Sequence, residues 1–244
     1  MKIKNNTILI TGGSSGIGLA LATGFSELNN KVIIVGRDIK KLKAAAERNN
    51  NIDYLQCDLS NEQEFDTLVV ELENQYQDIN ILINNAAVQH NYCFLNENVS
   101  NGRIDREIFL NFNAPVKLSN RLLPILIAKP EAAIVNVTSG LGFVPKENAP
   151  VYCATKAALH SFSVTLRYQL EKTGIKVFEL IPSLVDTQMT AGRGENKISP
   201  EKLTDEFIAE FSKNIYEINI GKTGLLRTLN RFFPRIISKK LRNS

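Results

Sequence analysis

A tyrosine and a lysine four residues apart offer the clearest chemistry in this sequence. In a helix, the spacing of Tyr152 and Lys156 puts the two side chains on one face, one turn apart. A free phenol has a pKa of about 10 and is a weak acid–base catalyst at neutral pH. Because a nearby ammonium favours the phenolate, we expect Lys156 to lower the pKa of Tyr152. Ser139, upstream of both, would hold a substrate oxygen beside the phenol, although tyrosine–lysine pairs also occur on ordinary helix surfaces.

A glycine-rich turn near the N-terminus predicts a phosphate site. The apolar run 7–10 reads as a strand buried on both faces, and it leads directly into Thr11-Gly12-Gly13-Ser14-Ser15-Gly16-Ile17-Gly18. A helical pattern follows. A strand, a glycine turn and a helix in this order place backbone N–H groups and a helix N-terminus against a phosphate, typically the pyrophosphate of a dinucleotide.

The end of the second predicted strand, 31–35, indicates which dinucleotide. In NAD-binding proteins an acidic residue about twenty positions after the glycines bonds the ribose 2′-hydroxyl. Here Gly36 and Arg37 stand at that place, and a small residue followed by a cation suits the 2′-phosphate of NADP. Asp38 is one position later, and we expect it to cap the following helix. The alternative is that Arg37 is an ordinary surface charge.

Strands and helices alternate through the rest of the chain. Further strands are predicted at 53–57, 80–83, 132–138 and 176–181, and helices at 61–77, 102–128 (bent near Pro115) and 150–172. This alternation predicts an α/β fold with a parallel sheet and helices on both faces. Ligands of such sheets bind at the carboxyl ends of the strands. Six polar, glycine or proline residues fall at or just beyond such ends, so we expect them to converge: Gly18, Arg37, Asp58, Asn85, Ser139 and Pro182.

Composition excludes several other classes. The chain has 244 residues, 43% of them hydrophobic, which suits one large domain. The 3 cysteines and 2 histidines form no zinc-spaced cluster, so we expect no metal site and a reducing, cytoplasmic location. No signal peptide or membrane-spanning stretch is visible. Nucleic-acid binding is also not expected, because the basic residues lack an aromatic platform or a known module.

With these residues in view, the chain resembles the short-chain dehydrogenase/reductase family over nearly its whole length. The glycine turn resembles the cofactor fingerprint TGxxxGxG, Asn84-Asn85-Ala86-Ala87 resembles NNAG, and Pro182-Ser183-Leu184-Val185-Asp186-Thr187 resembles PGxVxT. Ser139, Tyr152 and Lys156 match the catalytic Ser, Tyr and Lys of the family. The turns and the C-terminal run 224–231 further resemble the bacterial DltE branch.

The resemblance implies the site residues. The catalytic set is Asn111, Ser139, Tyr152 and Lys156, where Asn111 is preferred to Asn113 because the family places its asparagine six residues after an aspartate, here Asp105. The implied cofactor contacts are Gly12, Ser14, Ser15, Gly16, Ile17, Gly18, Arg37, Asp58, Leu59, Asn85, Ala86, Ala87, Tyr152, Lys156, Pro182, Val185 and Thr187. Asp58 would lie beside the adenine. Ala87 and Ser183 replace glycines of the family, and we expect both to narrow the pocket.

The implied function is an NADP(H)-dependent oxidoreductase that transfers hydride between the nicotinamide and a carbonyl or secondary alcohol, with NAD(H) less favoured. The implied fold is a single-domain Rossmann fold with strand order 3-2-1-4-5-6-7, and a homodimer or homotetramer is expected. Six side chains are candidates for an apolar substrate pocket: Gln89, Leu141, Phe143, Val144, Leu184 and Met189. The polar segment from Thr187 to about Pro200 would cover the substrate.

The C-terminus leaves a second reading open. We divide the chain into a catalytic domain, 1–224, and a basic amphipathic extension of it, 225–244. From Ile218 onward there are seven basic residues and no acidic ones. The apolar face of this extension would pack on the domain or a sister subunit, or it would rest on an anionic membrane surface. Two alternative functions stay open. One is a non-catalytic dinucleotide sensor. The other, suggested by the DltE resemblance and by this extension, is a cell-envelope-associated partner protein.

Overall fold

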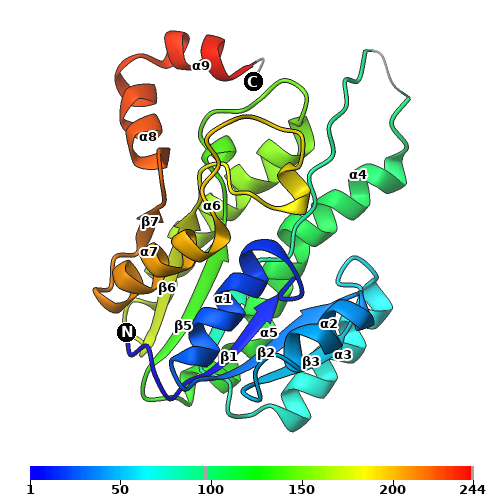
Figure 1. The fold of residues 1–244 in the computed structure, drawn as a ribbon, viewed down its shortest axis with the longest axis vertical. Helices are drawn as coiled ribbons and strands as arrows, with labels where there is room; N and C mark the ends of the chain where they lie inside the picture. Colours follow the sequence, from blue (N-terminus) through cyan, green and yellow to red (C-terminus); the bar gives the residue numbers. More distant parts are fainter. Residues whose placement is uncertain (96–97, 243–244) are drawn as a thin grey trace.

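Seven parallel strands form one sheet in the part of the chain that the structure describes (Figure 1). The structure is a computed structural model that describes residues 1–95 and 98–242. The strand order is 3-2-1-4-5-6-7, which confirms the predicted Rossmann fold. The strands are β1 (Thr7–Thr11), β2 (Lys31–Gly36), β3 (Ile52–Gln56), β4 (Ile81–Asn84), β5 (Ala132–Val137), β6 (Ile175–Ile181) and β7 (Glu217–Asn219).

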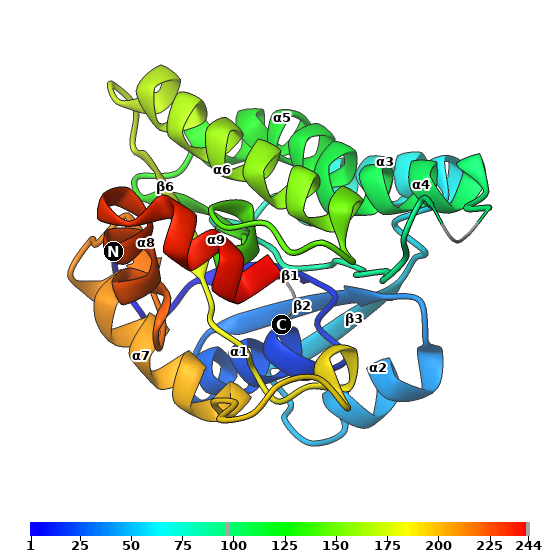
Figure 2. The same ribbon diagram turned by 90° about the horizontal axis from the view of Figure 1, so that it is seen from above.

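Helices cover both faces of the sheet (Figure 2). One layer holds α1 (Gly16–Glu27), α2 (Ile39–Ala46) and α7 (Pro200–Ser212), and the other holds α3 (Glu62–Gln75), α4 (Asn101–Ile108), α5 (Ala114–Ile127) and α6 (Pro150–Leu170). The residues of β1 show why the strands are continuously apolar. Ile8 and Ile10 pack with α1, whereas Leu9 packs on the opposite face, and all three are fully buried.

The long helix predicted at 102–128 is divided by a π-helical turn. This turn, Phe109–Asn113, lies between α4 and α5, and the amide of Ala114 donates to the carbonyl of Phe109, five residues back. Pro115 explains the irregularity, because it has no amide hydrogen and its ring would clash with the carbonyl of Asn111 in a regular α-helix. The bend was therefore predicted at the right proline, but the altered backbone precedes it and contains Asn111.

The C-terminal part of the fold was less predictable. The sequence analysis located neither α7 nor β7, which completes the sheet beside β6. Helix α8 (Thr223–Phe232) ends before Pro234, and a further helix, α9 (Pro234–Arg242), begins at that proline. A Cβ atom on Gly140 would lie 3.2 Å from Thr223 and 3.4 Å from Leu226, so α8 packs close to the turn that follows Ser139. Among the described residues, no helix has the length and apolar character needed to cross a membrane.

Candidate active site

A cavity of about 260 Å³ lies at the carboxyl ends of the central strands. Its wall is formed by the glycine turn after β1, the ends of β2, β4 and β5, the start of α6 and the segment after β6. Tyr152 and Lys156 from α6 reach the same cavity as Gly12 and Arg37. The convergence expected from a parallel sheet is thus present, because all these residues follow strands that end on one edge.

The conformation of the glycine turn is fixed by close backbone packing and by hydrogen bonds from Asn85. Gly12 has a φ of +66°, and a Cβ atom there would lie 2.9 Å from the Cα atom of Ala86. The Asn85 amide donates to the carbonyls of Thr11, at 2.9 Å, and Gly12, at 3.3 Å. Ser15 caps α1 but makes no side-chain cap hydrogen bond, so its hydroxyl and the helix N-terminus are available to an anion. This cradle fits a pyrophosphate.

The end of β2 has the features of a 2′-phosphate site. Arg37 is exposed and lines the cavity, while a Cβ atom on Gly36 would lie only 3.1 Å from the Ser14 hydroxyl oxygen. Asp38 uses its Oδ1 atom to accept hydrogen bonds from the amides of Lys40, at 3.1 Å, and Lys41, at 3.2 Å. The predicted helix cap is therefore present. It engages the carboxylate of Asp38, the acidic residue nearest to where the cofactor ribose is expected.

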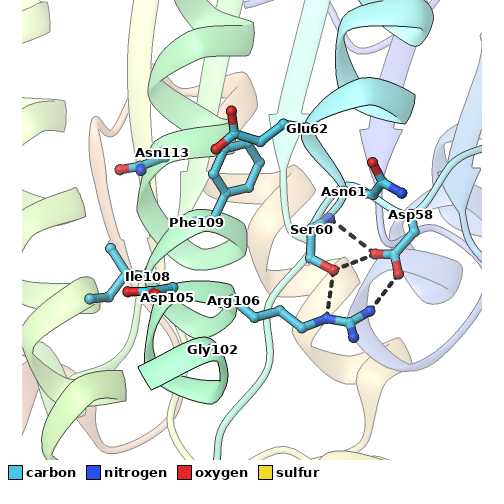
Figure 3. A pocket seen from close by; sticks show the side chains of 10 residues that line it. All are labelled: Asp58, Ser60, Asn61, Glu62, Gly102, Asp105, Arg106, Ile108, Phe109 and Asn113. Atoms are coloured by element: carbon cyan, nitrogen blue, oxygen red, sulfur yellow. Dashed lines mark hydrogen bonds and ion pairs between the residues drawn. The ribbon is translucent and has the colours of Figure 1, made fainter. Parts of the chain in front are cut away.

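Asp58 lines the cavity and is also bound by Arg106 from α4 (Figure 3). Its Oδ2 atom is 2.5 Å from Nη2 of Arg106, and its Oδ1 atom accepts from the amide and hydroxyl of Ser60. Burial opposes ionisation of the carboxyl, but the Ser60 hydrogen bonds and the charges of Arg106 and Arg37 outweigh it and lower the pKa of Asp58. These groups border a second hollow of about 690 Å³ between α4 and the start of α3 (Figure 3).

Tyr152 and Lys156 line the cavity, and Ser139 lies next to Tyr152. The side chains of Tyr152 and Ser139 are hydrogen-bonded, and the Ser139 Oγ atom also accepts from the amide of Leu141 at 3.1 Å. The Lys156 Nζ atom lies 5.8 Å from the centre of the Tyr152 ring. Tyr152 is 8% exposed and Lys156 is 2% exposed. The strand end of β5 and the first turns of α6 therefore supply all three groups.

The pKa values of this pair differ from the sequence expectation. Burial raises the pKa of Tyr152 to about 12, and the Ser139 hydrogen bond opposes this only in part. Burial also lowers the pKa of Lys156 to about 8. The Lys156 ammonium donates to the carbonyl of Val137 at 2.8 Å rather than to the phenol. In the protein alone, burial therefore outweighs the charges that act on the phenol, and Lys156 without a bound cationic ring does not bring the pKa of Tyr152 toward neutrality.

Asn111 is fully buried beneath the site and holds the segment after β4. Its side chain accepts from the amide of Val88 at 2.9 Å and donates to the carbonyl of the same residue at 2.8 Å. It also contacts the Thr155 hydroxyl at 3.3 Å, in the turn of α6 between Tyr152 and Lys156. Because Pro115 has no N–H, the carbonyl of Asn111 lacks the usual i+4 donor.

Most residues implied as cofactor contacts line the cavity, with two exceptions. Gly18 lies beneath the turn, where a Cβ atom would be 2.3 Å from the carbonyl oxygen of Gly12, and Val185 is buried in a bridge with Ile198. Several cavity residues were not singled out from the sequence: Val35, Gly36 as a lining residue, Cys57, Val88, Leu110, Val137, Thr138 and Gln188. Their common signal is position, since most directly follow or end a strand.

The expectations for the substrate side need correction. Ala87 lines the cavity, but the Ser183 hydroxyl faces Gly221, where a Cβ atom would be 2.4 Å from it. Only Ala87 therefore narrows the pocket. Phe143 packs between His160, with ring centres 4.6 Å apart, and the guanidinium of Arg227, at 4.3 Å, and is not available as an apolar wall.

Comparison with known proteins assigns the chain to a family. A short chain dehydrogenase family profile matches residues 6–198. The chain belongs to the short-chain dehydrogenase family. The uncharacterized oxidoreductase DltE of Bacillus subtilis is 43% identical over 237 residues, which cover 95% of this chain and 94% of that protein. This short-chain dehydrogenase is therefore close to DltE, as the C-terminal run had indicated.

Solved structures support the same assignment. A short-chain dehydrogenase from Sphingobium yanoikuyae in complex with NADPH has a TM-score of 0.83 and 28% identity, with 96% of this chain and 95% of that chain covered. A bulky-bulky ketone specific alcohol dehydrogenase from Comamonas testosteroni has a TM-score of 0.81 and 26% identity, with 96% and 94% covered. The family and fold indicate an oxidoreductase that uses a nicotinamide dinucleotide.

Proposed function

We propose that this short-chain dehydrogenase is an NADP(H)-dependent oxidoreductase that interconverts a carbonyl and a secondary alcohol, with Asn111, Ser139, Tyr152 and Lys156 as its catalytic set. One observation carries the proposal: Tyr152 and Lys156 line the same cavity as the glycine turn, and a side-chain hydrogen bond links Tyr152 to Ser139. The cavity residues fit a dinucleotide, because the turn accepts a pyrophosphate and Ser14, Gly36 and Arg37 accept a 2′-phosphate.

The proposed chemistry divides between the cofactor and the chain. When bound, the nicotinamide would supply the hydride that reduces the carbonyl carbon. Tyr152 would donate its phenolic proton to the carbonyl oxygen, and a pKa of about 12 keeps that proton in place at neutral pH. Ser139 would donate a hydrogen bond to the same oxygen as negative charge develops. Its Oγ atom already accepts from Leu141, which leaves the hydroxyl hydrogen free to be donated.

Lys156 and Asn111 would return the proton to Tyr152. The Lys156 ammonium is anchored on Val137 beside the cavity, where it would also orient a ribose hydroxyl. The Asn111 carbonyl, which lacks its helical donor, would hold a water molecule between Lys156 and solvent. The buried position of Asn111 and its contact with Thr155 support this role.

Turnover of carbonyl compounds with NADPH tests the proposal. The purified protein is incubated with a panel of ketones and aldehydes, and oxidation of NADPH is followed at the nicotinamide absorbance. We expect activity with NADPH to exceed activity with NADH. If dinucleotide binds but no carbonyl compound or alcohol reacts in either direction, the protein is the non-catalytic dinucleotide sensor instead.

The C-terminal helices favour a second, additional role at an anionic membrane surface. Four apolar side chains are exposed here among basic ones: Leu225 and Phe232 on α8, Phe233 between the helices and Ile236 on α9. Co-sedimentation with phosphatidylglycerol vesicles tests this, with phosphatidylcholine vesicles as the control. We expect binding that the Phe232→Ser/Phe233→Ser variant loses. Equal recovery of both proteins in the supernatant would reject the membrane-associated role.

A homodimer or homotetramer is proposed for the same protein. Helices α4, α5 and α6 lie together on one side (Figure 2), and Ile127 and Tyr168 are exposed there. Light scattering after size exclusion would measure the assembly, and a single-chain mass would reject it. A cytoplasmic location likewise remains a proposal.

A further inference from the structure

Arg193 carries a buried nitrogen that the fold does not satisfy. It belongs to the segment after β6 that the sequence placed over the substrate. Among the described residues, its Nη1 atom is inaccessible to solvent and has no hydrogen-bond partner. A buried, unpaired guanidinium nitrogen costs free energy. Such a group is expected to persist where it has a ligand to bind.

The segment that carries Arg193 is fixed at its base. The backbones of Asp186 and Leu184 pair with Ile198 through two hydrogen bonds of 2.9 and 3.0 Å. The Lys197 ammonium binds the Thr190 carbonyl at 2.7 Å, and the Arg193 amide donates to the same carbonyl at 3.0 Å. The base of this segment is therefore ordered by its own hydrogen bonds, which also fix the backbone of Arg193.

Lys146 approaches the same place from the segment that leads into α6. Its backbone amide donates to the Sγ atom of Cys153 at 3.4 Å, directly beside Tyr152. Burial lowers the pKa of Lys146, and the positive charge of Arg193 lowers it further, so the two cations are close enough to repel. The Arg193 charge also acts on Tyr152, whose pKa it lowers against the effect of burial.

Other charged side chains near Lys146 and Arg193 form ion pairs, whereas these two cations do not. Glu147 binds Arg242 at 2.6 Å, and Asp186 binds Lys197 at 3.3 Å. Neither Lys146 nor Arg193 has an acidic partner among residues 1–95 and 98–242. Figure 2 shows the segment that carries Arg193 and the segment before α6 on either side of the C-terminal end of α9.

We propose that Arg193 and Lys146 form an anion site for the substrate, and that the substrate is therefore a carbonyl or hydroxy compound with a carboxylate group. The proposal rests on the proposed function and names its substrate class. A guanidinium offers two parallel N–H donors that match a carboxylate, and an ammonium adds a point charge. Binding such an anion would satisfy the Nη1 atom and relieve the repulsion between the two cations.

A single negative charge fits the surroundings best. The carboxyl group of Glu107 also acts on Tyr152, where it raises the pKa. It is fully buried and accepts from the His90 amide at 3.2 Å and the Tyr92 hydroxyl at 3.3 Å. Because the Glu107 carboxyl group is close to the phenol, the charges of Arg193 and Lys146 favour a substrate anion with one negative charge over one with two.

The experiment uses keto acids and their methyl esters. A series of linear keto acids, in which the carboxylate lies progressively farther from the carbonyl, is assayed with NADPH, and each acid is paired with its ester. For at least one acid, we expect kcat/KM to exceed that of the ester. In Arg193→Gln this preference should fall about tenfold to hundredfold, mainly through KM of the acid, and Lys146→Gln should act in the same direction.

Controls separate this site from general effects. Lys202→Gln removes one exposed positive charge near the same segment and should leave the acid-to-ester ratio unchanged. An unchanged ratio in Arg193→Gln would overturn the proposal. So would a weaker affinity of that variant for NADPH with the ratio intact, because the guanidinium would then serve the cofactor.

A binding measurement keeps this test independent of turnover. Saturated carboxylic acids of the same lengths are titrated into the protein–NADP⁺ complex by calorimetry. Wild type should bind the acid and Arg193→Gln should bind it at least about tenfold more weakly. If no carbonyl compound or alcohol of the earlier panel reacts in wild type either, the proposed function fails, and the calorimetry alone decides the anion site. Absence of carboxylate binding to wild type would overturn that site.

Discussion

The Lys156 ammonium is anchored by the last residue of β5, through a hydrogen bond of 2.8 Å to the carbonyl oxygen of Val137. The same strand end continues into Thr138 and Ser139. The sheet therefore sets the positions of Lys156 and Ser139 together, and α6 adds Tyr152 one turn before the lysine.

Replacement of Tyr152 by Phe removes the proposed proton donor and little else. General acid–base catalysis typically contributes about 10²–10⁴ in rate, so kcat should fall by that range. The affinity for NADPH, measured by quenching or calorimetry, should stay within about twofold, because the ring remains. Full activity of Tyr152→Phe would show that another group donates the proton.

Replacement of Lys156 by Met should change how stability depends on pH. Burial lowers the pKa of Lys156 from 10.5 to about 8, so the unfolded chain binds more protons than the folded protein between these values. The free energy of unfolding of wild type should therefore rise relative to Lys156→Met as the pH rises from about 8 to 10.5. The change is on the order of 2–3 kcal/mol. Denaturant titrations across this range measure it, with exposed Lys172→Met as the control, and parallel pH curves for wild type and Lys156→Met would contradict it.

Replacement of Arg37 by Gln should weaken the preference for NADP. A charged hydrogen bond contributes about 1.5–3 kcal/mol, so kcat/KM for NADPH should fall about tenfold to hundredfold while the value for NADH changes little. Lys43→Gln, an exposed change on the same side in α2, is the matched control. An equal loss with both cofactors would mean that Arg37 does not read the 2′-phosphate.

Replacement of Pro115 by Ala should disturb the position of Asn111 without harming the fold. The new amide hydrogen can donate to the Asn111 carbonyl, which would favour a regular helix in place of the π turn. A small displacement at the site lowers kcat, here by at least about tenfold. Pro124→Ala, in the same helix but remote from the cavity, should keep full activity. Thermal unfolding should show both variants at least as stable as wild type, and retained activity in Pro115→Ala would reject this role.

Local patterns were enough for most of the framework. Continuous apolar runs located strands such as β1 and β4, because strands buried on both faces have no polar side to alternate with, whereas β3 was located by its place in the alternation of strands and helices. Asp38 was correctly predicted to cap α2, since capping depends on neighbours in sequence. Helix α7 was missed as well as strand β7, and for the strand the reason is that three residues at the sheet edge carry little pattern of their own.

The amino-acid sequence by itself determined the order of strands and helices, and it named the groups that reach the cavity. Tertiary structure decided their chemical state. Tyr152 and Lys156 are spaced for mutual tuning, yet burial drives their pKa values to about 12 and about 8, because desolvation depends on what packs around a group. The same holds for Arg193 and Lys146, which are 47 positions apart in the chain. Only the fold brings their charges together, because electrostatic contact depends on distance in space and not on separation along the chain.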